Sequence, residues 1–249
     1  MIDLHSHILP GVDDGPVTIE ESLEIARRAA AEGVRVIAAT PHVRDDYPTS
    51  PETMERLVGE VKAALQESGI ALDVRPGGEV ALDWVERLPT EELRRFGLGG
   101  NPDYLLVEFP YYAWPLTLLE LVIGLRARGI TPVVAHPERN AEVQADPARM
   151  RPLVEAGALV QLTAASVDGR LGHDAAHASR SLIRSGLAHL IASDAHSAEV
   201  RAAGLDAAAR AVGDAPLARW LTVDVPGAVV GGTPIPPRPD SRRRGLLHR

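Results

Sequence analysis

Two histidines separated by one residue stand near the amino end of the chain, at His5 and His7. They belong to an apolar stretch typical of a short strand, and side chains at positions i and i+2 of a strand point to the same face. An acidic turn with Asp13 and Asp14 follows. Two imidazoles and a nearby carboxylate suit a divalent transition-metal ion. This stretch therefore predicts a metal centre, to which other strands should add ligands.

Composition narrows the possible chemistry. The 249 residues are 45% hydrophobic, which is enough for one α/β barrel or two smaller domains. The net charge of -8 argues against a nucleic-acid-binding surface, and the lack of cysteine excludes disulfides, a thiolate nucleophile and a cysteine-type zinc site. Neither a signal peptide nor an apolar run long enough to span a membrane is evident. We therefore expect a cytoplasmic protein that is not itself a membrane protein.

Strands and helices alternate along the sequence, a pattern that predicts parallel βα units. Thr18 and Glu21 have the spacing of a capping box and begin a helix that Gly33 ends. After the strand at the amino end, the expected strands cover residues 34–40, 70–75, 104–110, 131–137, 158–163 and 188–196. The further expected helices cover residues 51–69, 81–96, 115–129, 147–157, 173–186 and 198–212.

Six of the seven expected strands end in residue types that bind metal ions. Because the carboxyl ends of parallel strands meet at one edge, these side chains should face one another. A closed barrel brings all of them together, whereas an open sheet leaves some too far apart. The set consists of His5, His7, His42, Glu79, Glu108, His136, Asp194 and His196.

Each candidate ligand taken alone also has a structural interpretation. A buried carboxylate such as Glu108, or an imidazole such as His136, can be satisfied by hydrogen bonds within a core. Eight residues in equivalent positions favour the metal interpretation. The spacing does not decide which of Asp13 and Asp14 is a ligand and which belongs to the turn.

Two arginines follow the strand ends closely. Arg139 lies three residues after His136, and Arg201 begins the helix expected after His196. Each is either a surface arginine or part of a clamp for an oxyanion, because the planar guanidinium group matches phosphate.

These motifs resemble those of PHP-domain (polymerase and histidinol phosphatase) proteins, and more narrowly the bacterial manganese-dependent protein-tyrosine phosphatases of capsule and exopolysaccharide operons. The matching motifs are Asp3–Gly15, Thr40–His42, Pro76–Glu79, Val107–Pro110, His136–Asn140 and Ser193–His196 followed by Arg201. The resemblance implies an α/β fold of the PHP type, a distorted (β/α)7 barrel. We expect this single domain over residues 1–230, with a flexible Pro- and Arg-rich tail over residues 231–249.

The resemblance also implies three divalent metal ions, with Mn²⁺ favoured and Zn²⁺, Fe or Co²⁺ as alternatives. In many PHP proteins the position near Asp14 is a histidine, so Asp13 remains an alternative ligand. The implied ligands are His5, His7, Glu79 and Asp194 for the first ion, Glu79, Glu108 and His136 for the second, and Asp14, His42 and His196 for the third.

The activity implied is metal-assisted hydrolysis of phosphotyrosine on proteins, with Arg139 and Arg201 gripping the phosphate. Either His42 or a metal-bound water molecule would protonate the leaving phenolate. The implied partner is a bacterial tyrosine autokinase that controls capsular or exopolysaccharide synthesis and carries phosphotyrosines in its tail; an oligomer is compatible with the sequence. The alternatives are a small-molecule phosphatase, such as a histidinol phosphatase, and a non-catalytic regulatory module stabilised by metal ions.

Overall fold

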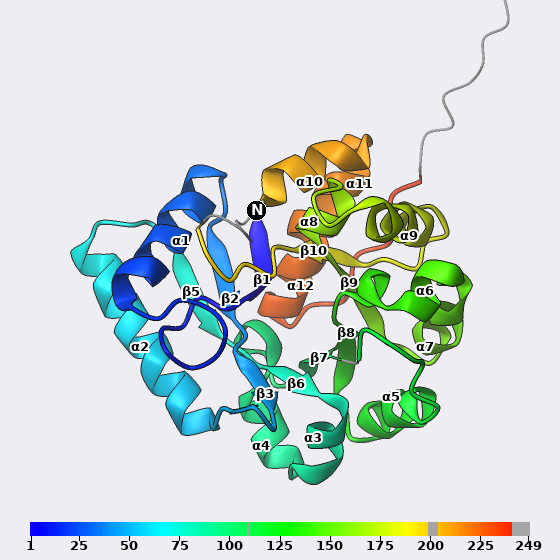
Figure 1. Ribbon diagram of the computed structural model, residues 1–249, viewed down its shortest axis with the longest axis horizontal. Coiled ribbons are helices and arrows are strands. Elements are labelled where there is room, and N and C mark those ends of the chain that lie inside the picture. Colours follow the sequence, from blue (N-terminus) through cyan, green and yellow to red (C-terminus); the bar gives the residue numbers. More distant parts are fainter. Residues whose placement is uncertain (109, 199–203, 241–249) are drawn as a thin grey trace, which may run out of the picture.

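The computed structural model describes residues 1–108, 110–198 and 204–240. Figure 1 shows helices placed around a central group of strands. The strands are β1 (Ile2–Ser6), β2 (Val36–Ala39), β3 (His42–Arg44), β4 (Tyr47–Pro48), β5 (Asp73–Pro76), β6 (Glu79–Ala81), β7 (Tyr104–Glu108), β8 (Thr131–Val134), β9 (Leu159–Thr163) and β10 (Leu190–Ala192). The α-helices are α1 (Ile19–Ala31), α2 (Pro51–Glu67), α3 (Leu82–Arg87), α4 (Thr90–Arg95), α5 (Leu118–Ala127), α6 (Ala141–Ala145), α7 (Arg151–Glu155), α8 (Ala164–Val167), α9 (His173–Arg184), α10 (Leu205–Val212), α11 (Ala215–Arg219) and α12 (Val225–Gly231).

The strands form two hydrogen-bonded groups, and the chain passes from one group to the other. One group has the order β1-β2-β5, and the other has the order β10-β9-β8-β7-β6-β3-β4. The chain joins the groups directly, because β2 continues into β3 and β5 continues into β6. A parallel bridge between Ser6 and Ala195 connects the end of β1 to the segment after β10. The strands thus surround a common centre, which confirms the α/β fold and the distorted (β/α)7 barrel of the PHP type.

Two breaks in the strands bring potential ligands to the barrel's edge. Pro41 separates β2 from β3, and Gly77 and Gly78 separate β5 from β6. A Cβ atom at Gly78 would lie 2.6 Å from Phe96 Cδ1, so only glycine allows this close approach. After the breaks, β3 and β6 pair in parallel with His42 opposite Glu79.

Local sequence signals account for most of the helices. Thr18 caps α1 in a complete capping box with Glu21, as predicted, and Ser50 caps α2 ahead of Pro51. The helical region expected over residues 81–96 is divided into α3 and α4, which Pro89 separates. Of the helix expected over residues 198–212, α10 accounts for the last part, and residues 199–203 lie outside the described residues.

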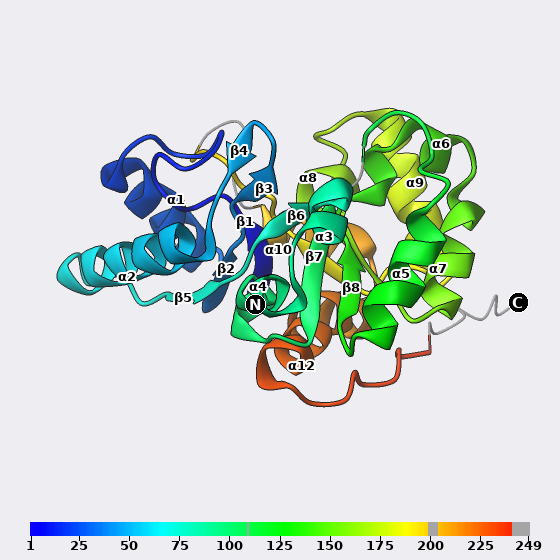
Figure 2. The same ribbon diagram turned by 90° about the horizontal axis from the view of Figure 1, so that it is seen from below.

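The amino ends of the strands are covered by the carboxyl-terminal part of the domain. Figure 2 shows α12 at one end of the barrel and the β3–β4 hairpin at the other. Asn101, just before β7, donates from Nδ2 to the carbonyl oxygen of Val229 in α12 at 2.6 Å. Apolar residues such as Leu4 and Leu105 are fully buried in the core beneath the strand ends. The polar edge of the barrel therefore lies opposite a closed, apolar end.

The described part of the predicted tail lies against the domain. Trp220 donates from Nε1 to the carbonyl oxygen of Pro236 at 2.9 Å, and Arg238 donates to the carbonyl oxygen of Ile183 at 2.6 Å. The division into a barrel over residues 1–230 and a flexible tail stays a prediction. In the part of the chain that the structure describes, no helix combines the length and apolar character needed to cross a membrane.

Candidate metal centre

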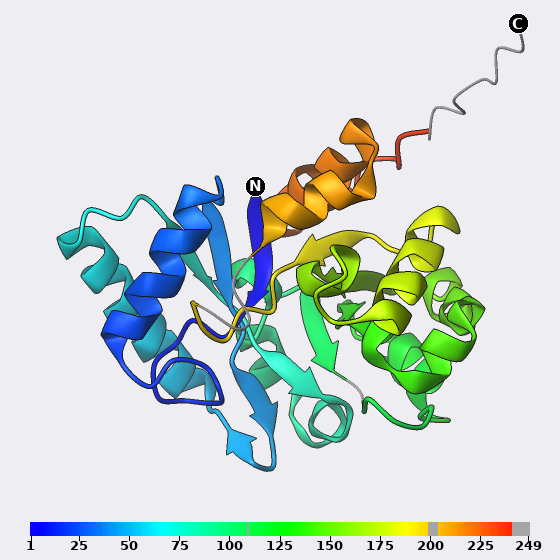
Figure 3. The same ribbon diagram turned by 45° about the horizontal axis from the view of Figure 1, so that its top comes forward.

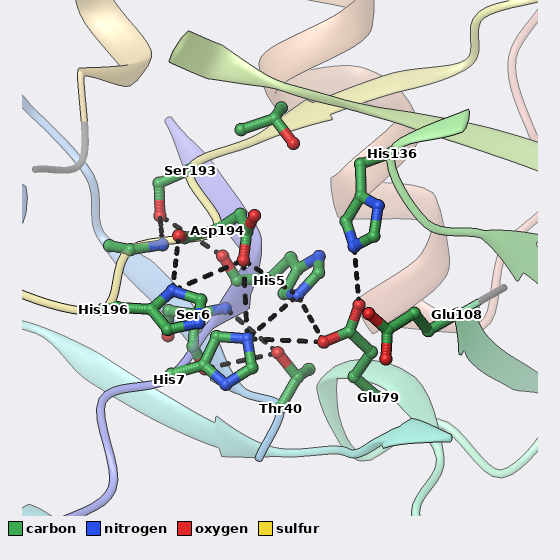
Figure 4. A network of polar contacts seen from close by, with 12 residues as sticks. His5, Ser6, His7, Thr40, Glu79, Glu108, His136, Ser193, Asp194 and His196 are labelled. Atoms are coloured by element: carbon green, nitrogen blue, oxygen red, sulfur yellow. Dashed lines mark hydrogen bonds and ion pairs between the residues drawn. The ribbon is translucent and has the colours of Figure 1, made fainter. Parts of the chain in front are cut away.

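The carboxyl ends of the strands bring nine predicted ligand residues into one cluster, most of which Figure 4 shows. Their potential ligand atoms form four overlapping groups, and all atoms within a group lie within 4.8 Å of one another. Eight of the nine residues are buried, and the side chain of Asp14 is 36% exposed. The groups are His5, His7 and Asp194; His5, Glu79 and His136; His42, Glu79 and Glu108; and His7, Asp14, His42 and His196.

His5 and His7 direct their Nε2 atoms at the same point. His5 Nδ1 lies 3.1 Å from Gln161 Oε1, and His7 Nδ1 lies 2.7 Å from Asp13 Oδ2. Because both oxygens accept, the neutral imidazoles carry their protons on Nδ1, so both Nε2 atoms present lone pairs. These two Nε2 atoms are 3.3 Å apart, a distance at which two lone pairs repel unless a cation lies between or beside them.

The carboxylates around this point also favour a bound cation. Glu79 Oε2 lies 3.3 Å from His5 Nε2 and 3.4 Å from His7 Nε2, and Asp194 Oδ1 lies 3.5 and 3.4 Å from the same two atoms. Glu79 Oε2 is buried and accepts no hydrogen bond from the described residues. A buried carboxylate oxygen without a donor is costly, and a divalent ion is the partner that matches this set of oxygen and imidazole ligands.

Glu79 also connects the first group to its neighbours. Its Oε1 lies 2.8 Å from His136 Nε2, and its Oε2 lies 3.0 Å from His42 Nδ1. Glu108 Oε2 lies 3.5 Å from the same His42 nitrogen. Because β3, β6 and β7 are adjacent, these residues face a common space, and Glu79 lies between the other groups.

The two acidic residues of the first turn have different positions. Asp13 accepts hydrogen bonds from the backbone N–H groups of Gly15 and His42 at 3.0 and 3.1 Å, besides its contact with His7. Asp14 instead faces the cluster, with Oδ1 3.1 Å from His196 Nε2 and 3.5 Å from His42 Nε2. His196 donates from Nδ1 to a backbone carbonyl oxygen at 2.9 Å, so its Nε2 is directed at Asp14.

Two ligand candidates have left-handed backbone conformations, with φ of +34° at His136 and +54° at Asp194. Such strain in residues other than glycine is concentrated at functional sites. The expected strand over residues 188–196 is wrong beyond Ala192, where β10 ends. The chain turns there because Ser193 N donates to Asp3 Oδ1 at 2.9 Å and Asp194 N donates to His5 O at 2.8 Å.

Ionisable side chains in the cluster favour their charged forms although they are buried. Burial opposes the protonated form of His42, but Glu108 and Glu79 raise its pKa to about 9. Burial likewise opposes ionisation of Glu79, yet the surrounding histidines hold its pKa well below the usual range, and the pKa of Asp194 is lowered for the same reason. The carboxylates thus attract positive charge, which protons or metal ions can supply in competition.

The sequence matches the family described as capsular polysaccharide synthesis, CpsB/CapC, over residues 1–216. The chain belongs to this family. It is 36% identical over 202 residues to "Tyrosine-protein phosphatase YwqE" of Bacillus subtilis (strain 168), covering 81% of this chain and 79% of that protein. It is also 36% identical over 200 residues to "Putative tyrosine-protein phosphatase CapC" of Staphylococcus aureus, covering 79% and 77%.

A solved structure agrees with the fold of this CpsB/CapC family member. It comes from work on YwqE from Bacillus subtilis and CpsB from Streptococcus pneumoniae, described there as unique metal-dependent tyrosine phosphatases. The TM-score is 0.86 at 31% sequence identity, and the match covers 97% of this chain and 100% of that one. The predicted family resemblance is confirmed.

Of the two arginines predicted at the site, the structure describes Arg139 only. Arg139 donates from Nη1 to Asp194 Oδ2 at 2.6 Å, and its guanidinium lies 4.6 Å from the centre of the Tyr111 ring. It also lines the cavity at the cluster. Arg201 lies outside the described residues.

Two residues of the site, Arg44 and Gln161, were not predicted from the sequence. Arg44 lines the same cavity and donates to Glu108 Oε2 at 3.3 Å; it lies two residues after His42, and the period of a strand would have placed it on the same face. Gln161 accepts from His5 Nδ1 and from the backbone N–H of His136 at 3.2 Å through one oxygen. Its signal is a polar residue within a buried strand.

Proposed function

We propose that this protein is a metal-dependent protein-tyrosine phosphatase. The observation that carries the proposal is the convergence of the Nε2 atoms of His5 and His7 with the carboxylates of Glu79 and Asp194 on one point. Relatives with 36% identity are named tyrosine-protein phosphatases, which supports phosphotyrosine as the substrate.

We further propose three divalent ions, with Mn²⁺ as the native metal. The nitrogen and oxygen ligands, without sulfur, also suit Zn²⁺, Fe or Co²⁺. Asp14 is the ligand of the first turn because it faces two imidazole nitrogens, whereas Asp13 orients His7 from behind. The proposed ligands are His5, His7, Glu79 and Asp194; Glu79, Glu108 and His136; and Asp14, His42 and His196.

When bound, the ions would supply a Lewis acid that activates water and neutralises phosphate oxygens. Arg139 binds the phosphate through its planar guanidinium, which Asp194 and Tyr111 hold in place. We propose the same phosphate-binding role for Arg201. Either water in this cavity or His42, when it is not bound to an ion, would give a proton to the phenolate oxygen as the phosphate ester bond breaks.

The substrate we propose is the phosphotyrosine tail of a bacterial tyrosine autokinase, dephosphorylated in the cytoplasm during control of capsular or exopolysaccharide synthesis. The family's description as capsular polysaccharide synthesis proteins supports this partner. A histidinol phosphatase and a metal-stabilised regulatory module are the competing functions, and substrate choice and turnover separate them.

The test compares phosphate release from a phosphotyrosine peptide and from histidinol phosphate. Protein treated with a chelator, the same protein reloaded with Mn²⁺, and the His136→Ala variant are assayed together. Peptide turnover should return with Mn²⁺ and be absent in the variant. Turnover of histidinol phosphate alone would assign the protein to small-molecule metabolism, and bound metal without any turnover would favour the regulatory module.

A further inference from the structure

A second, larger cavity adjoins the metal centre. Its volume is about 480 Å³, against about 120 Å³ for the cavity at the metal centre, a ratio of four. Arg44 and Tyr111 line both cavities, so the two spaces adjoin each other. We propose that this larger cavity, the side groove, binds the polypeptide next to the phosphotyrosine and selects an apolar residue followed by a basic one. This inference rests on the proposed function.

The small cavity cannot hold a peptide. Imidazoles, carboxylates and the guanidinium groups of Arg44 and Arg139 surround its 120 Å³, a polar setting that suits a phosphate group. Tyr111 stands between this space and the side groove. The tyrosine ring and the chain that carries it must therefore extend from the metal centre, and the side groove is the adjoining space beyond Tyr111.

The walls of the side groove are mostly apolar. Leu82 at the start of α3, Leu121 of α5, and Pro110 and Pro115 of the loop between β7 and α5 line it. Figures 1 and 2 show α3 and α5 side by side at this edge of the barrel. Binding of an apolar side chain to such a surface is favourable because apolar area is removed from water. The surface discriminates only weakly between apolar side chains of different shape.

The outer end of the side groove is acidic. Asp83 and Glu86 of α3 line it. Asp83 forms an ion pair with Arg87 at 2.7 Å, whereas Glu86 has no ion-pair partner among the described residues. At the inner end, Arg44 forms ion pairs with Asp46 and Glu108, and the proposed phosphate site lies beyond it at the metal centre. A peptide with phosphate at the inner end and a lysine or arginine at the outer end matches this order of charges.

The loop that lines the side groove also carries exposed apolar residues. Leu116, between the lining residues Pro115 and Thr117, is 92% exposed, and Tyr112 in the same loop is 81% exposed. Large exposed apolar side chains gathered at the edge of a cavity are typical of binding surfaces. The ring of a small aryl phosphate reaches only the entrance of the side groove near Tyr111, so the outer part of the side groove should affect peptides alone.

The experiment measures kcat/KM of the manganese-loaded full chain on three substrates. Two are phosphotyrosine peptides that differ only in carrying lysine or glutamate after an apolar neighbour, and the third is 4-nitrophenyl phosphate. Wild type should prefer the lysine peptide, and Glu86→Lys should lower that preference roughly fivefold, the size expected for exposed charges. The preference should shrink as salt screens the charges.

A steric variant tests the side groove independently of charge. Thr117 is exposed, and its side chain makes no capping hydrogen bond to α5, so Thr117→Trp obstructs the side groove without removing such a bond. It should lower kcat/KM for both peptides about tenfold, an effect of introduced steric conflict, and leave 4-nitrophenyl phosphate unchanged. Glu67→Lys, an exposed charge reversal at the end of α2, is the matched control and should change none of these ratios.

The outcomes separate this inference from the proposed function. If wild type hydrolyses neither peptide although metal is bound, the proposed function fails. If wild type hydrolyses both peptides but neither Glu86→Lys nor Thr117→Trp changes a peptide ratio relative to 4-nitrophenyl phosphate, the side groove is overturned while the phosphatase activity stands.

Discussion

Histidines occupy two contrasting environments in this barrel. At the carboxyl ends of the strands, His5 and His7 direct their Nε2 atoms toward each other across 3.3 Å. His189, just before β10, instead accepts a hydrogen bond from Val160 N at 3.2 Å through Nδ1, and burial lowers its pKa to about 4. The second arrangement completes a backbone hydrogen bond, whereas the first is complete only with a cation. Burial alone therefore does not mark a functional histidine; the direction of its lone pairs does.

Removing one charge from the cluster should have the largest effect. Glu79→Gln keeps the shape of the side chain but removes the carboxylate that faces His5, His7, His42 and His136. We expect loss of bound metal and a fall in kcat/KM of about a thousandfold, which is about 4 kcal/mol of transition-state stabilisation. Metal analysis and a phosphotyrosine assay measure both. His189→Gln is the matched control, and an equal loss there would break the contrast between the two environments.

Gln161 should be a positioning residue for the cluster. Its oxygen holds the His5 proton on Nδ1 and also accepts from His136 N. Gln161→Leu should weaken Mn²⁺ binding about tenfold to a hundredfold, the usual cost of losing such a partner. Titration of metal-stripped protein followed by thermal unfolding measures it without an activity assay. The exposed Gln66→Leu on α2 is the control; unchanged affinity in Gln161→Leu would show that His5 needs no such orientation.

The two environments should respond to pH with opposite sign. In metal-free protein, the pKa of His42 is raised to about 9, so its stabilising effect is complete below about 6.5 and is lost as pH rises toward 9. The pKa of His189 is lowered to about 4, so its neutral form stabilises above about 6.5 and less as pH falls toward 4.

Thermal unfolding in chelator should therefore show a melting temperature that decreases from pH 6.5 to 9. Mn²⁺ should oppose this decrease, because metal ions replace protons between the carboxylates. A melting temperature that rises over this range without metal would contradict the charges assigned to the cluster.

The smallest effect should come from the structural histidine. His189→Leu leaves the Val160 N–H without its acceptor, which should lower the free energy of unfolding by about 1–3 kcal/mol. Chemical denaturation measures this change. Phosphatase activity and metal content should stay at the wild-type values. Loss of a metal ion in this variant would show that His189 contributes to metal binding and would contradict its structural role.

Much of the arrangement of the site could be predicted from the sequence, because the patterns that determine it are local. The spacing of His5 and His7 predicts that they share a face, and alternation of strands and helices predicts where strand ends meet. Pro41 and Gly78 can also be recognised in the sequence as residues that interrupt strands. The structural effect of these breaks depends on contacts with residues elsewhere in the chain, such as that of Gly78 with Phe96.

The remaining details depend on partners distant in sequence. The different positions of Asp13 and Asp14 appear only when His42 and His196 are in place. The left-handed turn at Asp194 depends on hydrogen bonds to the first strand, where Asp3 and His5 accept from the chain after β10. No periodicity within residues 188–196 encodes those bonds, so a continuous strand was the natural but wrong prediction.

The most direct measurement is a titration of chelator-stripped protein with Mn²⁺, in which bound metal and phosphate release from a phosphotyrosine peptide are recorded on the same samples. We expect no turnover without metal, about three ions bound per chain at saturation, and turnover that rises as the sites fill. Full turnover by protein shown to be free of metal would contradict the claim that the converging histidines and carboxylates form a catalytic metal centre.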